Sequence, residues 1–136
     1  MTCYFLKQKI QYKMVGFVGV HAGAGRHSER LRHKYEILCQ KACKEGIKII
    51  KTGGSHVDAA VIAAQILEDS ALTNAGFGSN LTFNGDVECD ASIMDGQNCT
   101  FGACGAVAGV KNPIALARSI CDAQRMPLTL GRVPPW

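Results

Sequence analysis

The sequence lacks several features that would each assign it to a known class of protein. No stretch approaches the ~18 consecutive apolar residues that a membrane-spanning helix needs, and residues 1–14 contain no apolar core of the secretory-signal type. None of the seven cysteines forms a Cys-x-x-Cys pair, so the pattern of a Cys-x-x-Cys followed by a histidine pair that is typical of zinc sites is absent. With 47% hydrophobic residues and only 4 prolines in 136 residues, the chain is also not disordered, collagen-like or a coiled coil.

Positive charge is missing from the middle of the chain. Residues 57–110 contain no lysine or arginine and carry a net charge of −7, whereas residues 1–56 carry +8 and residues 111–136 carry +3. Acidic residues interrupt the basic segment at Glu29 and Glu36, so we interpret that segment as a solvated helix face and expect no nucleic-acid partner and no membrane contact. Without an export signal, we expect an intracellular protein, in the cytoplasm, the nucleus or both, with reduced thiols.

The hydrophobic pattern predicts a layered α+β domain. Residues 1–14 have a weak pattern and are interpreted as a mobile leader. The Asn84-Gly85 pair is a strong hairpin signal between two short apolar segments, and Ser55 with Asp58 has the spacing of a helix cap. The predicted strands are 15–20, 81–83, 87–94 and 101–110, and the predicted helices are 28–52, 55–69 and 112–124.

Taken one at a time, the chemical signals are weak. The glycines after the first strand do not complete a dinucleotide-binding motif. His21 ends that strand, and a structural hydrogen-bonding role is favoured over catalysis because no nucleophile motif accompanies it. Asp86, Glu88 and Asp90 alternate along the predicted strand and so share one of its faces. Three carboxylates on one face could bind a metal, but for Asp86 and Glu88 we favour a solvent-exposed surface. For Asp90, burial and backbone donors are expected.

Taken together and in order, several segments resemble the α-subunit of type-2 asparaginases. Within that family they are most similar to the threonine aspartase (taspase) branch, on the basis of Ala22, Gly78-Ser79-Asn80-Leu81 and the segment 131–135. The resemblance covers residues 15–136 and excludes the leader 1–14. The matching segments are His21 to Gly25, Asp58 to Val61, Leu67 to Asp69, Asn74 to Leu81, Glu88 to Gly96, Gly102 to Val107 and Lys111 to Ile114.

The resemblance implies a fold, a reaction and a missing part. The fold is a partial αββα sandwich of the N-terminal-nucleophile hydrolase type, with its second half absent. The family cleaves its own precursor before a threonine, whose hydroxyl then attacks while its amine acts as the base. That threonine lies beyond the chain end, so this chain carries no catalytic nucleophile and is expected to be inactive alone.

Two functions follow from the resemblance. The first is the N-terminal part of an endopeptidase that cuts proteins after aspartate. The alternative is an asparaginase or β-aspartyl peptidase, or a non-catalytic truncated fragment. The implied partners are a β-subunit region, a second copy of the chain and, for the endopeptidase, aspartate-containing nuclear regulatory proteins.

Only supporting roles carry over to residues of this chain. Five residues are expected near the active site, although Asn74 and Gly76 could equally well only shape a turn: His21, Gly23, Gly25, Asn74 and Gly76. No organic cofactor is implied. A structural Na⁺ is implied in some relatives, through the main-chain carbonyls of Leu67, Glu68, Ser70, Thr73, Ala75 and Phe77.

Overall fold

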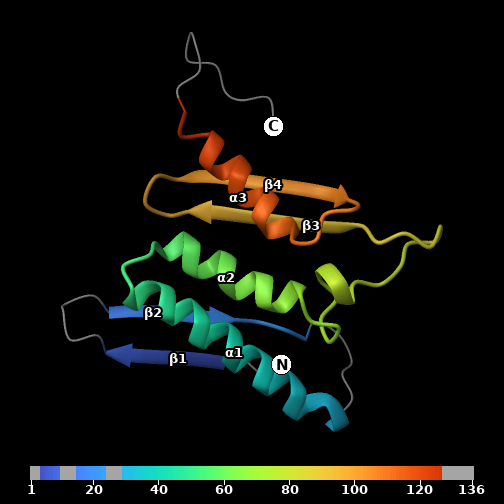
Figure 1. Cartoon of the computed structure of the whole chain (residues 1–136), viewed down its shortest axis with the longest axis horizontal. Helices are drawn as coiled ribbons and strands as arrows, with labels where there is room; N and C mark the ends of the chain where they lie inside the picture. The colour runs from blue at the N-terminus through green and yellow to red at the C-terminus, as the bar shows by residue number, and fades with distance from the viewer. Residues whose placement is uncertain (1–3, 10–14, 24–28, 127–136) are drawn as a thin grey trace.

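The computed structural model describes residues 4–9, 15–23 and 29–126. It contains two separate two-stranded antiparallel sheets and three α-helices. Helix α1 (Arg32–Lys51) packs on the first sheet and α3 (Pro113–Ala123) on the second. Helix α2 (His56–Glu68) contacts both of these helices and lies between the two sheets (Figure 1). Among the described residues, no helix has the length and apolar character required to cross a bilayer.

The first sheet pairs β1 (Tyr4–Lys9) with β2 (Val15–Val20), so that Tyr4 lies opposite Val20 and Lys9 opposite Val15. Strand β2 was predicted, but β1 was not. The structure places a strand, Tyr4–Lys9, within the segment that we interpret from its sequence as a mobile leader. Its weak hydrophobic pattern concealed a segment whose backbone is satisfied by pairing with β2.

The second sheet is the hairpin of β3 (Cys89–Asp95) and β4 (Thr100–Val107). The predicted hairpin around Asn84-Gly85 is wrong: residues 81–83 form no strand, and the pair instead occupies an isolated tight turn between Thr82 and Asp86. The sheet turns at Asp95, whose carboxylate accepts hydrogen bonds from the Gln97 N–H and the Asn98 amide, each at 2.9 Å. These bonds fix the reversal after β3.

The helices follow their local signals. The Ser55 hydroxyl accepts from the Asp58 N–H at 3.0 Å, and the Asp58 carboxylate accepts from the Ser55 N–H at 3.1 Å, which confirms the predicted capping arrangement of α2. Helix α3 begins at Pro113, one residue after the start of the predicted range 112–124, because the fixed φ of proline suits the first helical position. Helix α1 follows a short 3₁₀ turn, Glu29–Leu31, and its predicted first residue, Ser28, lies outside the described residues.

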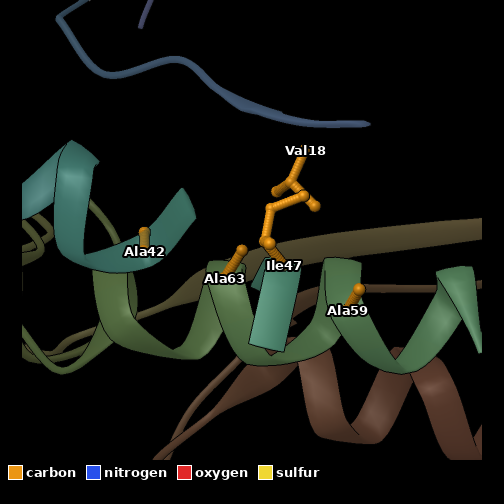
Figure 2. Packing of buried hydrophobic residues seen from close by; sticks show 5 residues of the cluster. All are labelled: Val18, Ala42, Ile47, Ala59 and Ala63. Atoms are coloured by element: carbon orange, nitrogen blue, oxygen red, sulfur yellow. The ribbon is translucent and has the colours of Figure 1, made fainter. Parts of the chain in front are cut away.

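Two small apolar clusters hold the layers together. The first joins β2, α1 and α2 through side chains that face one another in Figure 2: Val18, Ala42, Ile47, Ala59 and Ala63. The second joins α2 to α3 and the β3–β4 hairpin: Val57, Ile93, Ile114, Ala117 and Cys121. The alanines bring the helices close to their neighbours, so the clusters are small but dense.

The faces of the two sheets that point away from the helices carry exposed apolar side chains. Phe17 on β2 is 53% exposed, and Met94 and Phe101, which are paired across β3 and β4, are 61% and 49% exposed. The described residues thus form a mixed α/β structure with small sheets, and a second, facing sheet of the expected sandwich is not among them.

Candidate functional site

A cavity of about 290 Å³ lies where β2 ends, between the segment 21–23, helix α1 and the loop 72–75. It brings together His21, Gly23 and Asn74, which are far apart in the sequence and were all predicted to support the active site. Gly25, the other predicted residue of the first segment, lies outside the described residues. Gly23 has φ +112°, a conformation that favours glycine and turns the chain away from the strand at the cavity wall.

The loop after α2 is held by its own polar groups. The Asn74 side-chain oxygen accepts a hydrogen bond from the Asn80 N–H at 2.8 Å, closing the segment 74–80. The Thr73 hydroxyl bonds the Leu67 carbonyl and lies 3.3 Å from that of Ser70. Asn74 is exposed and Thr73 half-buried, so the loop presents an amide side chain at the cavity while its hydroxyl is used internally.

Gly76, also predicted at the site, is buried beside the end of α2. Its φ is +55°, and a Cβ added there would lie 2.5 Å from the Glu68 carbonyl oxygen. A Cβ on Gly78 would similarly lie 2.6 Å from the Ser70 carbonyl oxygen. Both the backbone conformation and the close approach therefore require glycine at position 76. It shapes the loop and is absent from the residues that line the cavity beside His21 and Asn74.

Several main-chain carbonyls converge in this loop. Those of Leu67 and Ser70 both meet the Thr73 hydroxyl, and those of Glu68 and Ser70 face the two glycines. Oxygen-only ligands suit hard cations, so this part of the implied Na⁺ ligand set is compatible with a cation. The Ala75 carbonyl instead accepts from the Gly78 N–H at 3.3 Å, and Phe77 is 77% exposed. In the described part of the chain, no group of His, Cys, Asp and Glu side chains could hold a metal ion.

The Glu68 side chain connects this loop to α3. It is buried, and its Oε1 accepts from the Ile114 N–H at 2.9 Å, at the positive end of the α3 dipole. Its Oε2 is buried without a hydrogen-bond partner. Burial raises the pKa of Glu68, and the bond from Ile114 opposes that shift. Glu68 therefore ties the end of α2 to the start of α3.

Tyr35 was missed by sequence reasoning. From α1, its hydroxyl donates to the Leu72 carbonyl at 2.7 Å, and its side chain lines the same cavity as His21 and Asn74. It thereby fixes the loop that carries Asn74 to the helix layer. A contact across 37 positions of sequence has no local pattern, so only an alignment of relatives could have indicated it.

The other polar candidates lie outside the cavity. Asp86 and Glu88 are exposed in the loop before β3, as the wet-surface interpretation predicts. Asp90 is exposed, so the prediction of burial is wrong because its side chain lies on the open face of β3. Its Oδ1 does accept from the Ala106 N–H at 2.7 Å, which confirms the predicted backbone donor.

A buried carboxylate at Asp95 was also missed. It is 2% exposed and bonds His56 Nε2 at 2.9 Å and Arg125 Nη2 at 2.5 Å, in addition to the two donors of its own turn. These donors, with the Gln97 N–H first among them, hold the pKa of Asp95 far below its ordinary value. Through these bonds, Asp95 connects the start of α2, the β3–β4 turn and the segment just after α3. Asp95 does not line the cavity at the end of β2.

Comparisons with known proteins place this geometry in a family. A model of the asparaginase family (Asparaginase_2) matches residues 13–130. The isoaspartyl peptidase/L-asparaginase of Mus musculus is 50% identical over 82 residues, which cover 60% of this chain and 25% of that protein. For the corresponding protein of Xenopus laevis the identity is 42% over 103 residues, 76% of this chain and 33% of that protein.

An archaeal relative gives the same result. The plant-type L-asparaginase of Pyrococcus abyssi is 42% identical over 114 residues, which cover 82% of this chain and 37% of that protein. The chain thus spans about a third of the length of the curated relatives it matches. These comparisons support the expected asparaginase family and do not show the threonine aspartase branch within it. The chain belongs to the asparaginase family.

Proposed function

We propose that this chain is the N-terminal, α-subunit part of a hydrolase that acts on amides of aspartate, either asparagine itself or β-aspartyl peptides. The observation that carries the proposal is the cavity at the end of β2, where His21 and Gly23 meet Asn74. The printed names of the relatives, isoaspartyl peptidase/L-asparaginase and plant-type L-asparaginase, favour this substrate class over protein cleavage after aspartate.

The cavity offers supporting groups without an activated nucleophile. A hydroxyl attacks an amide only when a base removes its proton. Two hydroxyl residues line the cavity, and both donate their protons to main-chain carbonyls: Thr73 to those of Leu67 and Ser70, and Tyr35 to that of Leu72. The nucleophile is therefore proposed to be the N-terminal threonine of a β-subunit region, with Asn74 and the backbone of 21–23 beside it.

The uncovered surfaces support such a partner. In the described part of the chain, β2 pairs only with β1, so its other edge is open to a further strand. A second cavity of about 290 Å³ lies beside that edge, lined by small side chains of α2 such as Ala60 and Ala64. Met94 and Phe101, on the second sheet, are further exposed apolar side chains. Apolar surface of this kind marks an interaction site or an aggregation liability.

A Na⁺ ion is proposed to rigidify the loop after α2. The carbonyls of Leu67 and Ser70, which already converge on one hydroxyl, and the carbonyl of Thr73 would contribute most directly. The ion would supply charge to hold the loop, while Asn74 presents its amide to the cavity. Replacement of sodium by a large organic cation should then increase hydrogen exchange in the segment 67–77.

Cleavage of proteins after aspartate is kept as a second candidate because of one sequence detail. Ala22 stands where asparaginases usually have a second glycine, and it lines the cavity. The added methyl group reduces the conformational freedom of the segment beside the site. Such a change is compatible with an altered substrate, although the relatives favour the small-molecule reaction.

The proposal is tested with a chimera. The segment 15–126 replaces the matching part of the isoaspartyl peptidase/L-asparaginase of Homo sapiens, which is 44% identical to this chain over 106 residues. Purified chimera is assayed on asparagine, a β-aspartyl dipeptide and an aspartate-containing protein segment, with the 136-residue chain alone as the control. We expect turnover of the first two by the chimera and none by the chain. Turnover by the chain alone would contradict the missing nucleophile, and cleavage of only the protein segment would favour the second candidate.

A further inference from the structure

The turn at Asn84-Gly85 has the chemistry of a self-modifying site. Both residues are exposed, Gly85 has φ +88°, and no heavy atom lies within 4 Å of the position where a Cβ would be. No other part of the described chain therefore packs against the Cα of Gly85, and the turn projects into solvent. Exposed turn tips are also where local opening costs least.

We propose that Asn84 deamidates spontaneously through a cyclic imide, producing an isoaspartyl linkage in this chain. The Gly85 backbone nitrogen, after losing its proton to hydroxide, attacks the Asn84 side-chain carbonyl carbon, and the amide nitrogen leaves as ammonia. Water then opens the ring. Attack at the main-chain carbonyl gives isoaspartate, and attack at the side-chain carbonyl gives aspartate.

One hydrogen bond sets the rate. The Gly85 N–H donates to the Thr82 carbonyl at 3.0 Å, and the Thr82 N–H donates to the Asp86 carbonyl at 2.8 Å. The reacting nitrogen is free only when this small turn opens. The folded chain should therefore react more slowly at Asn84 than a short peptide with the same residues does.

The other four asparagines are each disfavoured for a reason visible in the structure. Asn112 precedes Pro113, which has no N–H to attack. The side chains of Asn74 and Asn98 are held by hydrogen bonds, to the Asn80 N–H and to Asp95 respectively. Asn80 precedes a leucine, whose side chain hinders ring closure.

The Asp95-Gly96 pair provides an internal control. Aspartate before glycine can form the same imide, with water as the leaving group, when its carboxyl is protonated. Asp95 is buried and held by four donors that keep it ionised and fixed in orientation. The structure therefore separates two dipeptides that can both form the imide: Asn84-Gly85 is free to react, and Asp95-Gly96 is held against it.

The consequence of the reaction is a new carboxylate beside an acidic segment. The formal net charge falls from +4 by one unit, and the added negative charge lies near Asp86 and Glu88. Isoaspartate also lengthens the main chain by one methylene within the Thr82–Asp86 turn. The turn should therefore lose its hydrogen bonds while β3 keeps its pairing.

The test ages the native chain in mildly alkaline buffer and maps its peptides by isotope-resolved mass spectrometry. We expect replacement of NH₂ by OH at position 84 before any other asparagine, one more acidic species on ion exchange, and isoaspartate detected by a methyltransferase specific for it. Asn84→Gln should lose the acidic species and keep the circular-dichroism spectrum. In guanidinium chloride, Asn84 should react faster in the same alkaline buffer, and Asp95-Gly96 should begin to isomerise at mildly acidic pH, where its released carboxyl is partly protonated.

Two results would overturn the proposal. The first is an intact Asn84 amide in aged native chain while the denatured chain deamidates there. The second is deamidation at Asn80 or Asn98 as fast as at Asn84. Neither result bears on the proposed hydrolase activity, because Asn84 and Gly85 do not line the cavity at the end of β2.

Discussion

Substitution of Gly102 by alanine tests the packing that holds the second sheet to its helix. Gly102 is buried on β4, and an added Cβ would lie 2.5 Å from the Cys121 backbone nitrogen and closer still to the Ala117 carbonyl oxygen. These are backbone atoms of α3 and cannot rotate away. Ordinary contact begins at 3.4 Å, so α3 would have to retreat by more than 0.9 Å, because the Ala117 oxygen is closer than the Cys121 nitrogen.

The cost follows from the density of the cluster. Protein interiors are close-packed, and overpacking typically lowers the free energy of unfolding by about 1–3 kcal/mol. Because the added Cβ of Gly102→Ala would overlap backbone atoms, we expect a loss of about 3 kcal/mol or more. Gly105, three residues along the same strand, is the matched control. A Cβ there would meet only the Asp90 carboxylate at 3.4 Å, so Gly105→Ala should be neutral or stabilise by about 0.4–1 kcal/mol.

Urea unfolding followed by circular dichroism measures the difference. With a dependence of about 2 kcal/mol per molar urea, the midpoints of Gly102→Ala and Gly105→Ala should differ by about 1.5–2 M. The soluble yield on expression is a second readout, because a displaced α3 would expose Ile114. Equal midpoints for the two variants would refute the close approach of β4 to α3.

Three further predictions concern single hydrogen-bonded groups. The pKa of Asp95 is far below its ordinary value, so the stability that its carboxylate contributes should be present above about pH 4 and lost as the pH falls. Between pH 5 and pH 2, the free energy of unfolding should therefore decline less steeply for Asp95→Asn than for the unsubstituted chain. Parallel curves for the two proteins would contradict this. Ser55→Ala removes the α2 cap and should destabilise by about 1 kcal/mol, whereas Ser119→Ala, which loses only a bond to a carbonyl on the exposed side of α3, should cost little. Tyr35→Phe should cost about 1 kcal/mol and increase hydrogen exchange around Leu72, and unchanged exchange there would argue against its role in fixing the loop.

Features with a local cause were predictable from the sequence. The Ser55 cap depends on residues three apart, and Pro113 starts α3 because its fixed φ suits the first helical position. The hairpin was misplaced because Asn84-Gly85 is the stronger local turn signal, whereas the true reversal follows Asp95, whose carboxylate binds Gln97 and Asn98 of its own turn and also distant His56 and Arg125. Such long-range contacts leave no pattern in a short window of sequence.

The residues of the candidate site likewise fall into those that the sequence indicated and those that only the tertiary structure reveals. His21 and Asn74 were found because segments around them resemble a family, and the structure brings both to one cavity. Tyr35 and the orphaned oxygen of Glu68 were not found, because their roles depend on which helix lies beside the loop. Strand β1 was missed because its pairing with β2 outweighs a weak pattern of its own.

The most direct test of the proposed active site is the effect of Asn74→Ala on the kinetics of the chimera with the human relative. We predict that Asn74→Ala lowers kcat/KM for a β-aspartyl dipeptide by at least about tenfold, while the unfolding midpoint stays close to that of the unsubstituted chimera. Ser119→Ala should change neither quantity. Unchanged kcat/KM in a folded Asn74→Ala chimera would contradict the assignment of the β2-end cavity as part of the active site.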